Sequence, residues 1–235
     1  MFSFLLGFVS EAVLLSRYSF TADASDSVGG LTGTINGGVN FNSGQAQFSG
    51  ASTFISLPNM FGSYSAVSIE VWASPSTGNI DWNRLLQFGQ YQTNNNLNTF
   101  SINRNNYGAA LGQFDFRYCD ANSNCMDNYI GTTFAGSSNV HVVVTLAVGS
   151  YPQVYINGAL ASPGTTDAIT GTVSNLLVSS IPITNFFYVG KSLETSTTHS
   201  LYGWVDELRI WGGVLSPQAV SFNYAMGPNY ASKLM

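Results

Sequence analysis

The residues that could do chemistry begin with two adjacent carboxylates, Asp206 and Glu207 in "GWVDELRIW", in a chain with only 8% charged residues. Paired carboxylates can cleave a glycosidic bond or bind a metal ion. The segment predicts a strand, where neighbouring side chains point to opposite faces, so this pair cannot flank one bond as acid and nucleophile. Glu70 in "SIEVWAS" has no acidic partner in its strand. We therefore expect no glycoside hydrolase.

The histidines and cysteines do not form a nucleophilic site. His141 lies in a valine-flanked segment typical of a hydrogen-bonded core histidine, and no serine or cysteine lies in a recognisable nucleophile motif. Cys119 and Cys125 are too few to complete a zinc site. A turn could bring the two cysteines within bridging distance, or both could be free. The polar composition suits an oxidising compartment and favours a disulfide.

Aromatic residues interleaved with amides are the remaining candidates for a ligand site. Sugars are recognised by aromatic faces against C–H groups and by amides and guanidinium groups that bind hydroxyls. Residues of these types in or beside the segments expected to be loops are Trp82, Asn83, Tyr91, Asn103, Arg104, Tyr107 and Tyr118. The same composition also fits a polar protein–protein interface. We expect Trp72, Trp204 and Trp211, on strand-like segments, to lie in the core.

The elements that must position these residues are short strands, because alternation of apolar and polar residues and β-branched runs dominate the chain. The predicted strands are 12–20, 46–50, 53–57, 67–74, 84–90, 99–103, 113–118, 141–147, 152–158, 186–192 and 203–211. Asn157-Gly158 predicts a two-residue hairpin turn. One helix is expected, capped by Ser216, with Pro217 in its first turn and Gly227 at its end. The pattern predicts an all-β sandwich or barrel.

Composition sets limits on the partners. The 235 residues are enough for one all-β domain. With 7 basic and 12 acidic residues, the chain has no patch that could neutralise a row of phosphates, so we expect no nucleic-acid partner. The apolar run within residues 1–12 is too short to span a bilayer, and this segment is either a strand or signal-like.

The order of several segments resembles a known family. The matching pieces include "YSFTADASDSVGG", "SIEVWASP", "VHVVVTL", "QVYINGAL", "FYVGKS" and "GWVDELRIWGGVLSPQAV". Together they resemble the laminin-G-like jelly-roll domains of the concanavalin A-like lectin/glucanase superfamily. The resemblance implies two curved antiparallel sheets, packed face to face, over residues 13–222, with 223–235 as a tail. It also implies adjacent first and last strands. The chain departs from the family at Asn139 and Val140, where a tryptophan is usual, and residues 78–130 match poorly.

The resemblance also suggests a metal site and a function. It brings the N-terminal loop near the last strand, where Asp23, Asp26 and Asp206 with backbone carbonyls would suit Ca²⁺. Alternatively, Asp23 and Asp26 cap turns, and Asp206 or Glu207 pairs with Arg17 or Arg209. Glucanases of this superfamily carry alternating carboxylates on one strand, a pattern that this chain lacks.

We therefore expect a non-catalytic extracellular, cell-surface or virion-surface module that binds carbohydrate or glycoconjugate through its loops. The alternative is a structural protein of an outer layer, such as a virion capsid, cell wall or filament. In that role the jelly roll makes protein–protein contacts and assembles with other surface proteins.

Overall fold

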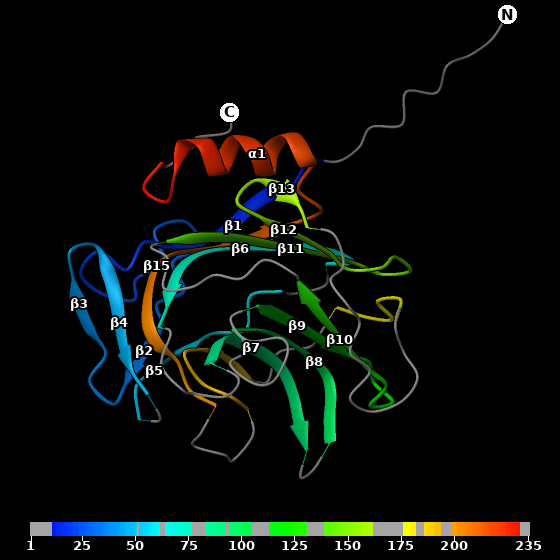
Figure 1. The fold of residues 1–235 in the computed structure, drawn as a ribbon, viewed down its shortest axis with the longest axis horizontal. Helices are drawn as coiled ribbons and strands as arrows, with labels where there is room; N and C mark the ends of the chain where they lie inside the picture. The colour runs from blue at the N-terminus through cyan, green and yellow to red at the C-terminus, as the bar shows by residue number, and fades with distance from the viewer. Residues whose placement is uncertain are drawn as a thin grey trace, which may run out of the picture.

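The structure, a computed structural model, describes residues 11–50, 52–61, 64–76, 83–92, 95–104, 113–130, 139–161, 176–181, 186–193 and 199–230, with positions 91–92, 95–97 and 128–130 described for the backbone only. Within these residues the chain forms fifteen strands and one helix. The strands make two layers, with the helix lying on the outside of one of them (Figure 1).

Both sheets are antiparallel throughout the described residues. Sheet A consists, in spatial order, of β13 (Ala159–Leu160), β12 (Gln153–Ile156), β11 (Val140–Ala147), β6 (Ala66–Pro75), β15 (Tyr202–Gly212), β4 (Gln45–Ser49) and β3 (Asn40–Asn42), with β1 (Val13–Tyr18) also paired to β15. Sheet B consists of β10 (Cys125–Ile130), β9 (Phe114–Cys119), β8 (Asn95–Arg104), β7 (Asn83–Gln92), β14 (Phe186–Val189), β5 (Phe54–Leu57) and β2 (Thr34–Asn36). The predicted jelly-roll sandwich is confirmed, and so is the pairing of the first strand with the last.

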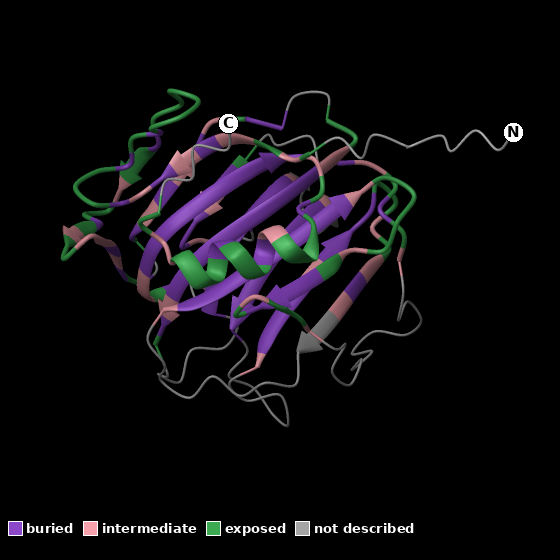
Figure 2. Ribbon diagram, turned by 90° about the horizontal axis from the view of Figure 1, so that it is seen from above, coloured by how far each residue is buried: buried purple, intermediate pink, exposed green. Residues whose placement is uncertain are grey.

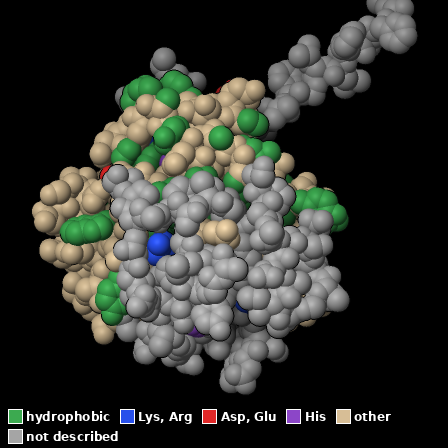
Figure 3. Space-filling model, viewed as in Figure 1, with side chains coloured by type: hydrophobic (Ala, Val, Ile, Leu, Met, Phe, Trp, Pro, Cys, Tyr) green, Lys and Arg blue, Asp and Glu red, His purple; other side chains and the backbone are tan. Residues whose placement is uncertain are grey.

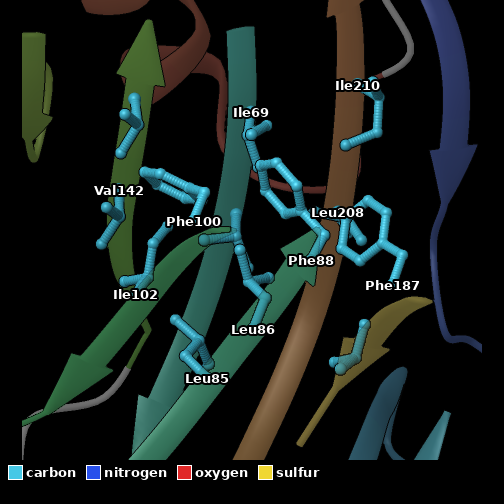
Figure 4. Packing of buried hydrophobic residues seen from close by; sticks show 14 of the residues in the cluster. Ile69, Leu85, Leu86, Phe88, Phe100, Ile102, Val142, Phe187, Leu208 and Ile210 are labelled. Atoms are coloured by element: carbon cyan, nitrogen blue, oxygen red, sulfur yellow. The ribbon is translucent and has the colours of Figure 1, made fainter. Parts of the chain in front are cut away.

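The core lies between the sheets because every second residue of each strand is apolar and points inward. Ile69, Leu208 and Ile210 of sheet A point toward Phe88 and Phe187 of sheet B (Figure 4). Each of these side chains is almost completely excluded from solvent. This packing determines which face of each strand points away from the core and can carry a functional site.

The helix α1 (Pro217–Met226) covers part of the outer face of sheet A (Figures 1 and 2). Ser216 caps it by accepting a hydrogen bond from the Ala219 backbone N–H at 3.2 Å, and Gly227, with a φ of 80°, ends it. A second apolar cluster fills the space between helix and sheet, made of Val143, Tyr155, Trp211, Leu215 and Val220. The suggested domain end at residue 222 falls inside this helix, so the helix belongs to the domain.

The predicted strands were found, and the differences are local. The turn at Asn157 and Gly158 has positive φ at both residues, 49° and 81°, and joins β12 to β13 as predicted. The short strands β2, β3, β10 and β13 were not predicted, because two to six residues carry too little alternation to be recognised. No helix among the described residues is long and apolar enough to cross a membrane.

The three tryptophans on strands do not lie between the two sheets. Trp72 and Trp211 are buried on the outer face of sheet A, where Trp211 packs beneath α1. Trp204 is only half-buried and faces outward, so the expectation that it lies in the core is wrong. A tryptophan on a strand can pack on either face, and the sequence does not show which one a helix will cover.

Candidate functional site

Asp206 and Glu207 lie at a β-bulge of β15, where the register to β6 shifts between Val205 and Glu207. Val205 and Leu208 both point into the core, so neither carboxylate does. The bulge thus breaks the strict alternation that the sequence suggested. The Asp206 Oδ2 atom accepts hydrogen bonds from the amides of Asn139 at 2.7 Å and Gln45 at 3.1 Å.

Glu207 is part of a buried network on the outer face of sheet A. Its carboxylate accepts hydrogen bonds from Arg17 at 2.9 and 2.7 Å and from Arg209. Burial raises the pKa of Glu207, and the two guanidinium groups counteract this. The Arg209 Nη2 atom also donates to the backbone oxygens of Pro228 and Tyr230, at 2.7 and 2.8 Å. Arg209 therefore ties the chain after the helix to the sheet, and Glu207 holds Arg209 in place.

Glu70 has a similar structural role beneath α1. It is fully buried and accepts hydrogen bonds from His141 Nε2 at 2.9 Å, Trp211 Nε1 at 2.9 Å and Asn223 Nδ2 at 3.1 Å. Asn223 belongs to the helix, so Glu70 anchors the helix to β6. With these partners, the acidic side chains of this face are engaged in holding the fold together.

The described residues do not assemble the calcium site suggested by the sequence. The Asp26 Oδ1 atom accepts hydrogen bonds from the backbone N–H groups of Arg17, Val28 and Gly29 at 2.9 to 3.0 Å, and its Oδ2 atom accepts one from the Leu31 N–H at 3.3 Å. Asp23 caps Ser25. No group of three or more histidine, cysteine or acidic side chains is placed to hold a metal ion in the described part of the chain. The described residues therefore give no support for a calcium ion held by Asp23, Asp26 and Asp206, and that site stays a prediction.

The loop residues proposed to bind a ligand are only partly described. Trp82 and Tyr107 lie outside the described residues, as does the Tyr91 side chain. Asn83 donates to the backbone oxygen of Tyr202 at 3.1 Å and accepts its N–H at 3.0 Å, and Arg104 donates to the Ser76 oxygen at 2.9 Å. Both therefore hold backbone segments together.

Tyr118 is fully buried between the sheets, because on β9 it follows the inward-pointing Phe114 and Phe116 at alternate positions. Its hydroxyl accepts the Ser179 N–H at 3.0 Å. Tyr118 is thus a core residue, shielded from solvent. Cys119, the next residue, is joined by a disulfide to Cys125 and closes the hairpin of β9 and β10.

A row of polar side chains crosses the outward face of sheet B from edge to edge. The strand register pairs, in order, Thr34, Ser56, Tyr188, Gln87, Ser101, Arg117 and Asp127. Directly paired residues share one face of a sheet. The alternate positions are the core residues of the same strands, so this row points away from the core.

The half of this face on β7 to β10 is charged and mostly buried. Arg84 Nη1 donates to Asn103 Oδ1 at 2.7 Å, and Asn103 Nδ2 donates to Asp115 Oδ2 at 2.9 Å. Arg117 lies 3.5 Å from the Asp127 carboxylate. Burial, reinforced by the charge of Asp127, raises the pKa of Asp115 to about 7. Burial also raises the pKa of Asp127. Asn103 is one of the residues that the sequence suggested for ligand binding, whereas its partners Arg84 and Asp115 were not suggested.

The other half of the face, on β14 and β5, carries an aromatic cluster of Phe54, Phe186 and Tyr188 with Lys191 above it. The rings of Phe54 and Tyr188 meet edge to face at 5.3 Å, and those of Phe186 and Tyr188 lie 5.8 Å apart. Phe186 is 42% exposed, and Phe54, Tyr188 and Lys191 are half-buried. Three rings that reach solvent on a rigid sheet can pack against the C–H face of a ligand.

Surface composition around the molecule is uneven. In the view of Figure 3, hydrophobic side chains gather at the top, over α1, and few charged side chains appear among the described residues. The exposed residues of that region include Phe222, Tyr224, Met226 and Tyr230. The aromatic cluster on sheet B differs from them because a buried polar network, which begins at Gln87 beside Tyr188, continues across the same face.

The comparisons with known proteins agree with this architecture. The sequence profile of the concanavalin A-like lectin/glucanases superfamily matches residues 48–221. The chain belongs to this superfamily. The predicted resemblance is therefore confirmed. A search of curated proteins finds no match.

Solved structures show the same fold at low sequence identity. Domain 4 of AbnA, an extracellular arabinanase from Geobacillus stearothermophilus solved in complex with arabinotriose, has a TM-score of 0.64 and 23% identity, covering 90% of this chain and 98% of that one. The receptor-binding domain of the botulinum neurotoxin C/D mosaic serotype has a TM-score of 0.65 and 14% identity over 91% of this chain and 51% of its own.

The ligand-binding domain of serotype D, in complex with N-acetylneuraminic acid, has a TM-score of 0.65 and 14% identity over 91% of this chain and 50% of its own. The chain thus spans about half the length of these toxin domains. At such identities the likeness concerns the fold alone.

Proposed function

We propose that this protein is a non-catalytic carbohydrate-binding module whose ligand packs on the aromatic cluster of sheet B. The observation that carries the proposal is the outward, solvent-reaching placement of Phe54, Phe186 and Tyr188 on two adjacent strands. Superfamily membership and the arabinotriose and N-acetylneuraminic acid complexes of structurally similar domains support it. The site differs from the loop site suggested by the sequence.

A non-catalytic role is supported by the use of the acidic residues. Glu70 and Glu207 are held by buried donors on the opposite sheet, beneath or beside α1. Asp115 and Asp127 on sheet B are paired with Asn103 and Arg117. A disulfide is typical of proteins that work outside the reducing cytosol, and we propose a secreted or surface location.

The test is binding of oligosaccharides, first on a glycan array and then by titration calorimetry. Replacing Tyr188 with alanine should weaken binding by about tenfold or more, equivalent to ~1.4 kcal/mol. The matched control is Tyr151→Ala, which removes a tyrosine that is 55% exposed in the turn region before β12. Binding that survives in the Tyr188 variant, or that falls equally in both variants, would exclude this placement of the site.

A second function, as a structural component of an outer layer, is favoured by the exposed apolar residues of α1. The helix has no charged residue, and Phe222 and Met226 are 48% and 41% exposed. An exposed apolar row of this kind often marks a protein contact. Light scattering at millimolar protein tests it. Assembly that disappears in Phe222→Glu, with no glycan bound by the native chain, would favour this function over the first.

A further inference from the structure

Lys191 is a cation placed over the aromatic cluster, and within the described part of the chain it forms no salt bridge. Its Nζ atom lies 4.2 Å from the ring centroid of Phe54 and 5.1 Å from that of Tyr188. Arg17, Arg117 and Arg209 each have a carboxylate within salt-bridge distance, but no acidic side chain of the described residues pairs with Lys191. Lys191 is half-buried as a residue, so part of it is accessible to a ligand.

The backbone fixes this lysine where β14 ends. Gly190, directly after β14, has a φ of 88°, and a Cβ atom there would lie 2.5 Å from the Phe48 ring. A side chain is therefore excluded on two grounds, conformation and space. The Gly190 N–H bonds to the Leu85 oxygen at 2.9 Å, and the Leu193 N–H bonds to Gln87 Oε1 at 3.1 Å. These contacts tie the segment carrying Lys191 to β7.

Charge on this face is distributed differently from charge on the whole chain. The chain has 7 basic and 12 acidic residues. The described side chains of the outward face of sheet B include three cations, Arg84, Arg117 and Lys191, and two carboxylates, Asp115 and Asp127. Burial raises the pKa of both carboxylates, which favours their neutral forms and reduces the negative charge on this face. The described side chains of this face therefore carry less negative charge than the chain as a whole, which favours an anionic ligand here.

We infer that the saccharide bound by the aromatic cluster is acidic, and that Lys191 pairs with its carboxylate or sulfate group. This inference rests on the proposed function. A sugar ring packs against Tyr188 and Phe186, and its anionic substituent draws the Lys191 ammonium from the ring faces. The two aromatic partners of Lys191 keep its charge beside the cluster before the ligand arrives.

The test compares matched acidic and neutral oligosaccharides: an oligogalacturonate with its methyl ester, and a sulfated galactan with its desulfated form. Lys191→Met should lose about ten- to a hundredfold in affinity for whichever acidic ligand the native protein prefers, because a charge-assisted hydrogen bond is lost. Its affinity for the neutral ligand should not change. Lys191→Arg should retain most of the binding.

The control is Lys233→Met, which removes the same charge from the chain's other lysine. Binding of the acidic ligand by the native protein should also weaken in about 1 M salt, where the screening length is ~3 Å. Equal affinity for acidic and neutral ligands, or equal loss in both lysine variants, would overturn the inference while leaving the proposed function intact. If no ligand of either kind binds at millimolar protein, the proposed function itself fails.

Discussion

The Asp115→Asn variant tests whether the carboxyl group of Asp115, in the charged half of sheet B, is protonated in the folded protein near neutral pH. Asp115 is fully buried and raised to a pKa of about 7, chiefly by burial, against an ordinary aspartate pKa of about 3.9. Asparagine preserves the size of the side chain, can still accept the hydrogen bond from Asn103, and does not titrate. The variant therefore removes the titration of residue 115 and keeps the packing of its side chain.

The expected size follows from the pKa difference. Because the folded state holds the proton more tightly than the unfolded state, Asp115 lowers the stability of the native protein as pH rises from about 4 to about 7. Each pKa unit is worth ~1.4 kcal/mol, so the change is on the order of 4 kcal/mol if Asp115 alone carries it. Coupling to Asp127, whose pKa is also raised by burial, spreads the loss over both groups.

The assay is chemical denaturation at a series of pH values from about 4 to about 8. The native protein should lose stability relative to Asp115→Asn as pH rises through this window. The control is Asp23→Asn, because hydrogen bonds from Ser25 lower the pKa of this exposed carboxylate and its effect has the opposite sign. Parallel stability curves for the native protein and Asp115→Asn would refute the reasoning.

Three further predictions concern the scaffold. Glu207→Gln should cost about 3–5 kcal/mol in denaturation experiments, because Arg17 and Arg209 lose their buried counter-charge, whereas the exposed Glu11→Gln should cost little. Cys125→Ser should cost about 2 kcal/mol for a loop closed across 6 residues, and a reducing agent should lower the melting temperature of the native protein but not of the variant. A chelator should leave the native melting temperature unchanged, because Asp26 and Asp23 accept hydrogen bonds from protein donors. A decrease would show that the protein binds a metal ion.

The sequence predicted the sandwich well because each long strand alternates clearly between an apolar and a polar face. The helix was equally clear, since Ser216, Pro217 and Gly227 are all residues with strong positional preferences at helix ends. The face of each polar residue was harder to predict. A single bulge at Asp206 changes the alternation of β15, and bulges leave no signal in a short stretch of sequence.

The site proposed on sheet B differs from the loop site that the sequence suggested, because aromatic residues were sought in the loops and assigned to the core on strands. Asn83 and Arg104 bind backbone groups, and Tyr118 fills the core, so a polar or aromatic residue near a loop is weak evidence for a ligand. The network of Glu70 could not be predicted, since its partners His141, Trp211 and Asn223 are up to 153 residues away along the chain.

The aromatic cluster does have a signal in the sequence. In "FFYV", Phe186 and Tyr188 occupy one face while Phe187 and Val189 occupy the other, and a strand of a two-layer sandwich has only one face against the core. At least one aromatic residue of this strand must therefore face outward. Phe54 in "TFISL" follows the same rule, because Ile55 and Leu57 take the inward positions. Two neighbouring strands with outward aromatic residues place large apolar area in contact with water, which soluble proteins tolerate mainly where a partner covers it. The alternation that predicts the fold thus also indicates the face on which we propose that the ligand binds.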